Sequence, residues 1–98
     1  MTLREFKNSL TSTKPPDGLN SALQAMWYDG KGDWETAHNI AQDLHTKQGS
    51  WIHAYLHRKE GDEGNAGYWY HRAGEKFPTV SLEKEWEELT ERFLILDF

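Results

Sequence analysis

The sequence predicts an all-α protein of about six helices, because apolar residues recur at helical spacing along most of the chain and strand-like alternation is absent. Two further observations support this fold class. Glycine, proline and aspartate cluster between the apolar stretches, where helices end and begin. A pattern of alanine, glycine and aspartate also occurs twice along the chain. With 98 residues, we expect a single domain over 1–98.

The first half of the chain is predicted to hold three helices. Thr2 and Glu5 have the spacing of a capping box for a short helix, which the turn sequence TSTKPPDG at 11–18 ends. An apolar stripe that begins at Leu19 marks a second helix. The sequence GKGD at 30–33 separates it from a third helix starting at Trp34, which KQGS at 47–50 is expected to close.

Three more helices are predicted in the second half. Ser50 is expected to cap a helix from Trp51 to about Glu60, and Asp62 a helix that runs to about Glu75. The sequence FPTV breaks the chain before a C-terminal helix over about 81–96, which Ser81 caps. Its apolar stripe lies opposite a charged one: Leu82, Trp86, Leu89, Phe93 and Leu96 against Glu83, Glu87, Glu91 and Arg92.

The internal repeat reads A-x6-G-D-x3-A. It runs from Ala25 to Ala37 and again from Ala54 to Ala66, a displacement of 54 − 25 = 29 residues. Alanine lets two helices approach closely, glycine permits the left-handed turn between them, and aspartate caps the second helix. We therefore expect two stacked, antiparallel helix hairpins, at about 19–48 and 50–78, with a capping helix at each end.

The repeat resembles the tetratricopeptide family and the related Sel1-like repeats. In the second unit, the small, turn, aromatic and terminating positions of such repeats are matched by Ala54, Gly61, Ala66, Tyr70, Ala73 and Pro78. The spacing is shorter than the usual figure of about 34 residues. The motif W-x-H-A-Y-L-H-R-x-E-G-D at 51–62 is also similar to one in small bacterial proteins.

The resemblance implies a function in binding. The first helices of stacked hairpins line a groove that takes an extended peptide or a partner helix. The residues implied for this groove are Met26, Asp29, Trp51, Tyr55, Arg58 and Lys59. The alternative is that the aromatic residues only pack and that the charged ones form a solvated face.

His53 and His57 are four residues apart, so they share one face of a helix and could both reach one metal ion such as zinc. The metalloprotease motif H-E-x-x-H has a glutamate as general base, whereas this chain has Ala54 in that position. Zinc needs further ligands, for which the candidates are His38, His71, Asp29 and Glu60. The structural alternative is that both imidazoles are at least half-buried and hydrogen-bonded, with Tyr28, Asp29, Glu60 or Tyr70 as neighbours.

Composition argues against several classes of function. The formal net charge of −5 argues against nucleic acid or an anionic membrane as the main partner, since both need a basic face. The absence of cysteine excludes disulfides and thiolate metal sites. No phosphate-binding loop or nucleophile elbow is found. Because the sequence has neither a signal-peptide core nor an apolar run near the ~18 residues that span a bilayer, a cytoplasmic protein is expected.

The sequence therefore favours a small, non-catalytic module that binds a protein or peptide and needs no cofactor. The alternative is a small metal- or ligand-binding protein, or an enzyme, centred on His53 and His57 with a divalent metal such as zinc. A surplus of apolar residues at Leu94, Ile95 and Phe98 also predicts a homodimer through the C-terminal helix, unless the tail folds back over the first helix.

Overall fold

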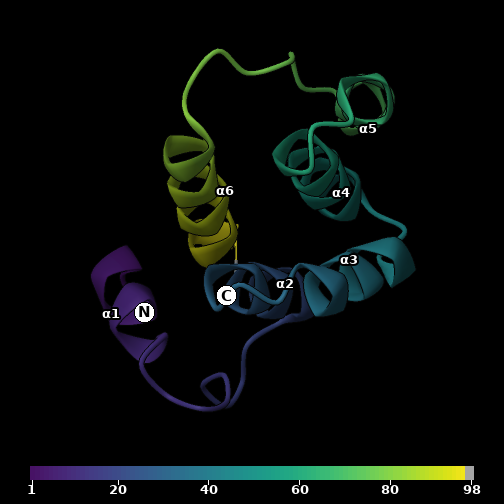
Figure 1. Cartoon of the computed structure of the whole chain (residues 1–98). Coiled ribbons are helices and arrows are strands. Elements are labelled where there is room, and N and C mark those ends of the chain that lie inside the picture. Colours follow the sequence, from purple (N-terminus) through teal and green to yellow (C-terminus); the bar gives the residue numbers. More distant parts are fainter. Residues whose placement is uncertain (97–98) are drawn as a thin grey trace.

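The structure is a computed structural model that describes residues 1–96, and it confirms the all-helical fold class. No strand occurs over this range. Six helices follow one another along the chain (Figure 1): α1 Leu3–Ser9, α2 Ser21–Gly30, α3 Trp34–Asp43, α4 Lys47–Lys59, α5 Glu63–Ala73 and α6 Leu82–Leu96.

The helices begin where the sequence supplies a capping side chain. Thr2 and Glu5 form the predicted capping box of α1. The side chain of Asn20 accepts a hydrogen bond from the N–H of Leu23 at 2.9 Å, so α2 begins at Ser21, slightly later than the apolar stripe indicates. The hydroxyl of Ser81 caps α6, as predicted. Each cap satisfies an N–H group that the start of a helix otherwise leaves unpaired.

The turns between α2 and α3 and between α4 and α5 have the same conformation. Gly32 and Gly61 have φ angles of 85° and 87°, in the left-handed region that glycine adopts without strain. The N–H of the next aspartate donates to a carbonyl five residues earlier, at 2.9 Å in both turns. The pairs are Asp33 with Tyr28 and Asp62 with His57. The two copies of the sequence pattern therefore form two hairpin turns of one shape, and these two helix pairs pack more extensively than any others.

The helix α4 begins earlier than the sequence indicates. The prediction that KQGS closes the third helix and that Ser50 caps the next is wrong, because α3 ends at Asp43 and KQGS forms the first turn of α4. Thr46 is the cap, and its hydroxyl accepts from the N–H of Gly49 at 3.0 Å. Gly49 permits a close contact instead of ending a helix, since a Cβ there would lie 2.2 Å from the carbonyl oxygen of Leu44.

The last helix closes the hydrophobic core. Figure 1 shows α6 between α1, α2 and α4, and it packs against all three. Its buried side chains Trp86, Leu89 and Phe93 join the aromatic residues of α1 and α2 in one cluster. The indole N–H of Trp86 also donates to the carbonyl of Met26 at 3.1 Å. The predicted apolar stripe is thus buried at these three positions; the side chain of Leu96 lies outside the described residues.

A buried carboxylate joins α6 to the second hairpin. Glu85 is 1% exposed, and it accepts hydrogen bonds from the hydroxyl of Tyr70 at 2.6 Å, from Nη1 of Arg58 at 2.8 Å and from the indole of Trp51 at 3.4 Å. Burial, followed by the hydrogen bond to Glu85, raises the pKa of Tyr70 above its usual value, so the hydroxyl stays protonated and donates. Three donors, one of them cationic, offset the cost of removing this carboxylate from water.

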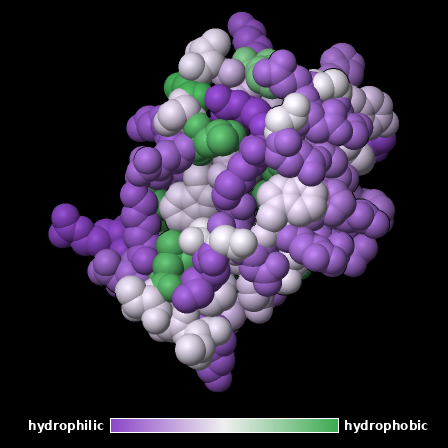
Figure 2. All heavy atoms as spheres, in the orientation of Figure 1, coloured by the Kyte–Doolittle hydropathy of each residue, from purple (hydrophilic) through white to green (hydrophobic). Residues whose placement is uncertain are grey.

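The surface offers few apolar groups. The face in Figure 2 is mainly hydrophilic, and hydrophobic residues appear on it as small patches. Ile95 is 68% exposed, whereas Leu94 packs partly against the core. Phe98 lies outside the described residues, and the homodimer stays a prediction. None of the described helices has the length and apolar character needed to cross a membrane.

Replacing Gly49 with alanine should lower the free energy of unfolding by about 1–3 kcal/mol, because the added methyl group meets the backbone of Leu44. Gly67 is the matched control, since it lies inside α5 and a Cβ there would meet nothing within 4 Å. Gly67→Ala should stabilise the protein by about 0.5–1 kcal/mol through helix propensity. Thermal unfolding followed by circular dichroism measures both changes. A Gly49→Ala variant as stable as the wild type would contradict the close contact.

Replacing Glu85 with alanine should cost about 3–5 kcal/mol, because it leaves the partly buried guanidinium of Arg58 without its carboxylate. The exposed Glu88, one turn further along α6, is the control, and Glu88→Ala should change stability by less than about 0.5 kcal/mol. Urea unfolding of both variants gives the comparison. Equal stability of the two would show that the buried ion pair does not hold α6 in place.

Candidate metal centre

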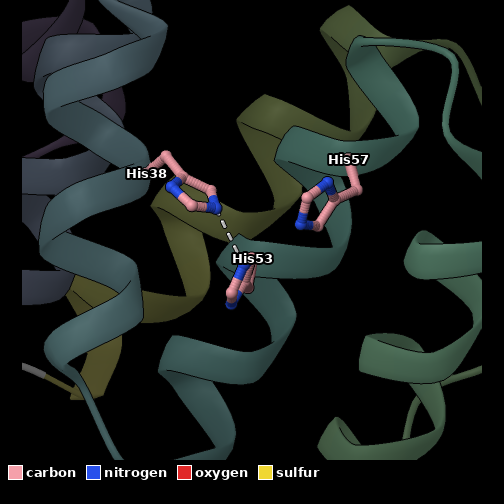
Figure 3. A group of neighbouring side chains, drawn as sticks. All are labelled: His38, His53 and His57. Carbon is pink, nitrogen blue, oxygen red and sulfur yellow. Dashed lines mark hydrogen bonds between the residues drawn. The ribbon is translucent and has the colours of Figure 1, made fainter.

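Three histidines meet between α3 and α4. His38 comes from α3, and His53 and His57 come from successive turns of α4 (Figure 3). One ring nitrogen of each lies within 4.8 Å of the others. The Nε2 atoms of His38 and His53 are 2.9 Å apart, and the stacked rings of His53 and His57 have centroids 4.8 Å apart. The fold thus brings His38, one of the candidate further ligands, together with the predicted pair His53 and His57.

Tryptophan rings enclose this histidine cluster on two sides. The ring of Trp34 stacks on His38 with centroids 4.8 Å apart, and Trp69 stacks on His53 at 4.1 Å. The indole N–H of Trp34 donates to the carbonyl of Leu56 at 2.9 Å, which holds the ring against α4. His53 is 7% exposed. These contacts fix the planes of two imidazoles and shield His53 from bulk water.

Glu60 supplies a carboxylate to the cluster. Its Oε1 lies 2.5 Å from Nδ1 of His57, which confirms the predicted contact between these residues. A hydrogen on Nδ1 donates to the carboxylate and leaves the lone pair of the other ring nitrogen free. In Figure 3 the ring of His57 faces His38 and His53. A carboxylate in this position fixes the tautomer and orientation of a metal-binding histidine. His53, in contrast, pairs with His38 and with none of its predicted neighbours.

Burial and nearby imidazoles favour the neutral forms of His38 and His53. Desolvation, followed by the charges of His38 and His57, lowers the pKa of His53 from 6.5 to about 4. Desolvation and His57 also lower the pKa of His38, against a smaller opposing effect of Glu60. The hydrogen bond between His38 and His53 thus joins one donor nitrogen and one acceptor nitrogen. Neutral imidazole is the form that binds a metal ion.

The residues predicted to line a peptide groove lie away from the histidine cluster, on α2 and on another face of α4. Met26 and Tyr55 are buried, and so is Asp29, which accepts hydrogen bonds from the hydroxyl of Tyr55 and the ammonium of Lys59, both at 3.0 Å. Trp51 and Arg58 contact Glu85 of α6 and are partly buried. Asp29, Tyr55 and Lys59 also line an open pocket that is bordered by α6, and the peptide groove stays a prediction.

Sequence reasoning missed the tryptophan rings that enclose the histidine cluster, and it missed the buried carboxylate of Glu85 on α6. Trp34 precedes His38 by four residues, a spacing that already indicated one helix face. Glu85 lies three residues after Leu82 and four before Leu89, on the apolar side of its helix. That position could have identified it as buried. Of the other predicted ligands, His71 is exposed on α5.

No protein-family model matches the chain, and no curated protein or solved structure matches it significantly.

The metal-free protein should lose stability as the pH falls from about 6.5 towards 4. In this range the unfolded chain protonates His53, whereas the folded protein, with the lowered pKa, does not. The unfolded state then binds more protons, so acid favours unfolding by up to about 1.4 kcal/mol for each unit of difference in pKa. Thermal unfolding in the presence of EDTA, at steps between pH 7 and pH 4, measures this loss.

The variant His53→Leu should show a smaller loss over the same pH range, because its buried ring no longer titrates. His71→Ala, which changes an exposed histidine, should keep the wild-type pH dependence. If His53→Leu followed the wild-type curve, His53 would not be the group responsible.

Proposed function

We propose that this chain binds a divalent transition-metal ion, in the first place zinc, through ring nitrogens of His38, His53 and His57. The observation that carries the proposal is the convergence of three imidazoles from two helices, with ligand atoms within 4.8 Å of one another. Zinc commonly takes three or four such ligands in a tetrahedral arrangement. The nitrogen donors and the lack of cysteine also suit copper and nickel.

The geometry is close to that of a zinc site. Zinc–nitrogen distances of about 2.0–2.1 Å and a tetrahedral angle place two ligand nitrogens about 3.3 Å apart. The Nε2 atoms of His38 and His53, at 2.9 Å, need to separate by only a few tenths of an ångström, and the ring of His57 needs to approach them. Small rotations of the side chains achieve both movements. The helices can therefore stay in place when the ion binds.

A purely structural role explains the cluster less well. Burial, followed by the charges of neighbouring imidazoles, lowers the pKa values of His38 and His53. The Nε2 atoms of these two rings satisfy only each other. A zinc ion would accept a lone pair from each ring and replace this contact. Glu60 would then be the carboxylate that orients His57, an arrangement typical of metal-binding histidines.

A second acidic group near His57 fits a ligand role less well. The carboxylate of Asp62 lies near His57 and Glu60, but it accepts hydrogen bonds from the backbone N–H and the side chain of Asn65 and so caps α5. The proposal therefore assigns three histidine ligands and leaves one position on the ion for water or another molecule. It assigns metal binding and no reaction. A role in binding a protein or peptide stays a prediction.

Zinc should bind the wild-type protein one to one and raise its melting temperature. A free zinc concentration of 100 times the Kd stabilises a protein by about 2.7 kcal/mol, which for a domain of this size is roughly 10 °C or more. His38→Ala removes one ligand that lies on α3 and should weaken zinc binding more than about a hundredfold. Isothermal titration calorimetry and thermal unfolding, with zinc and with EDTA, measure both effects.

His71→Ala is the matched control, because this exposed histidine lies outside the cluster, and it should bind zinc as the wild type does. Cobalt(II) serves as a spectroscopic probe, and intense visible absorption from a four-coordinate ion should appear in the wild type and vanish in His57→Ala. The circular dichroism spectra of the variants should match that of the wild type. If His38→Ala and His57→Ala bound zinc as tightly as the control, the proposal would be wrong.

A further inference from the structure

A cavity of about 650 Å³ opens beside His53, where the end of α3, the first turns of α4 and the side chains of α5 meet. Its size lies within the range of sites for small molecules. The lining residues that matter for binding are Lys47, Ser50, His53, Trp69 and Arg72. His53 therefore belongs both to the wall of this cavity and to the histidine cluster.

The lining of the cavity is basic, although the protein as a whole is acidic. Lys47 from α4 and Arg72 from α5 line it, and no carboxylate of the described residues does. His45 also lines the cavity. The chain carries a formal net charge of −5, so a positive cavity differs from the average of its surface. An anion is the ligand with complementary charge.

A ring nitrogen of His53 is also available in the same cavity. The Nε2 atom of His53 faces His38, and the Nδ1 atom has no hydrogen-bond partner among residues 1–96. Figure 3 shows this second nitrogen on the side of the ring away from His38. Because His53 lines the cavity, this nitrogen is available to a ligand there.

We infer that this cavity binds the phosphate group of a small molecule, which Arg72, Lys47 and the Nδ1–H of His53 hold together. A phosphate monoester carries up to two negative charges and three acceptor oxygens, so it can meet donors that come from different directions. The cavity is lined by Arg72 of α5 and by Lys47 and His53 of α4. The first turn of the thirteen-residue α4 adds the positive end of a helix dipole. A carboxylate has one charge and two oxygens and uses fewer of these groups.

The phosphate site and the metal centre would share His53, and this part of the inference rests on the proposed function. A metal ion on Nε2 forces the remaining hydrogen onto Nδ1, which makes Nδ1 a donor to the phosphate. A phosphate that accepts this hydrogen bond makes the ring a better metal ligand. Each ligand should therefore raise the affinity for the other by the same factor.

Phenyl phosphate is the probe, titrated into the whole chain after loading with one equivalent of zinc and removal of the excess. We expect one-to-one binding by calorimetry and NMR amide shifts confined to residues 44–53 and 69–72. The double variant Lys47→Gln/Arg72→Gln should bind at least about tenfold more weakly, because it loses two charge-assisted hydrogen bonds. The control Arg4→Gln/Lys76→Gln removes the same types of charge outside the cavity and should bind within about twofold of the wild type.

Four outcomes separate the claims. Zinc binding without phenyl phosphate binding would overturn the phosphate site and leave the metal function standing. Phenyl phosphate binding that is unchanged by zinc or EDTA would uphold the site and overturn the coupling to the metal. Benzoate binding as tight as that of phenyl phosphate would overturn the choice of phosphate. Equal weakening by both double variants would show general charge attraction in place of a site.

Discussion

The packing of α6 onto the two hairpins depends on one buried carboxylate, that of Glu85. It gathers a cation and two polar side chains from α4 and α5, so removing α6 would break all three hydrogen bonds and expose buried polar groups. Next to it, Trp86 and Phe93 complete the hydrophobic cluster that includes α1 and α2. In a domain of 98 residues, one such helix supplies a large share of the core. The last helix is therefore part of the core, although the repeat pattern indicates it only as a cap.

The position of α6 also decides which face of α4 remains available for chemistry. Tyr55 and Arg58 face the contacts with α2 and α6, where their polar atoms bind Asp29 and Glu85. His53 and Arg58 differ by five positions, and residues at this spacing lie on different sides of a helix. The histidines consequently face α3 and the ring of Trp69 on α5. One helix thus separates a network of carboxylates from a cluster of imidazoles.

Local sequence signals predicted most of the fold because they act over short distances. A glycine followed by a capping aspartate defines both hairpin turns, and the apolar stripes define the helix faces. The start of α4 was missed because a glycine can either end a helix or permit a close backbone contact, and Gly49 permits the contact with Leu44. The spacing of His53 and His57 predicted their shared face for the same local reason. His38 was only one candidate of several, since its approach depends on how α3 packs on α4, which no local pattern encodes.

The distribution of acidic groups connects the proposed metal and phosphate sites. Asp29 is buried, but it binds Tyr55 and Lys59 on the other side of α4. Burial, followed by the charge of Asp29, raises the pKa of Tyr55, so the hydroxyl stays protonated and donates. Among the described residues, Glu60 is the carboxylate that hydrogen-bonds to the histidine cluster. A zinc ion on three neutral imidazoles would bring two positive charges, of which Glu60 balances one. Because buried charge is costly without compensation, an anion beside His53 would supply the second balancing charge.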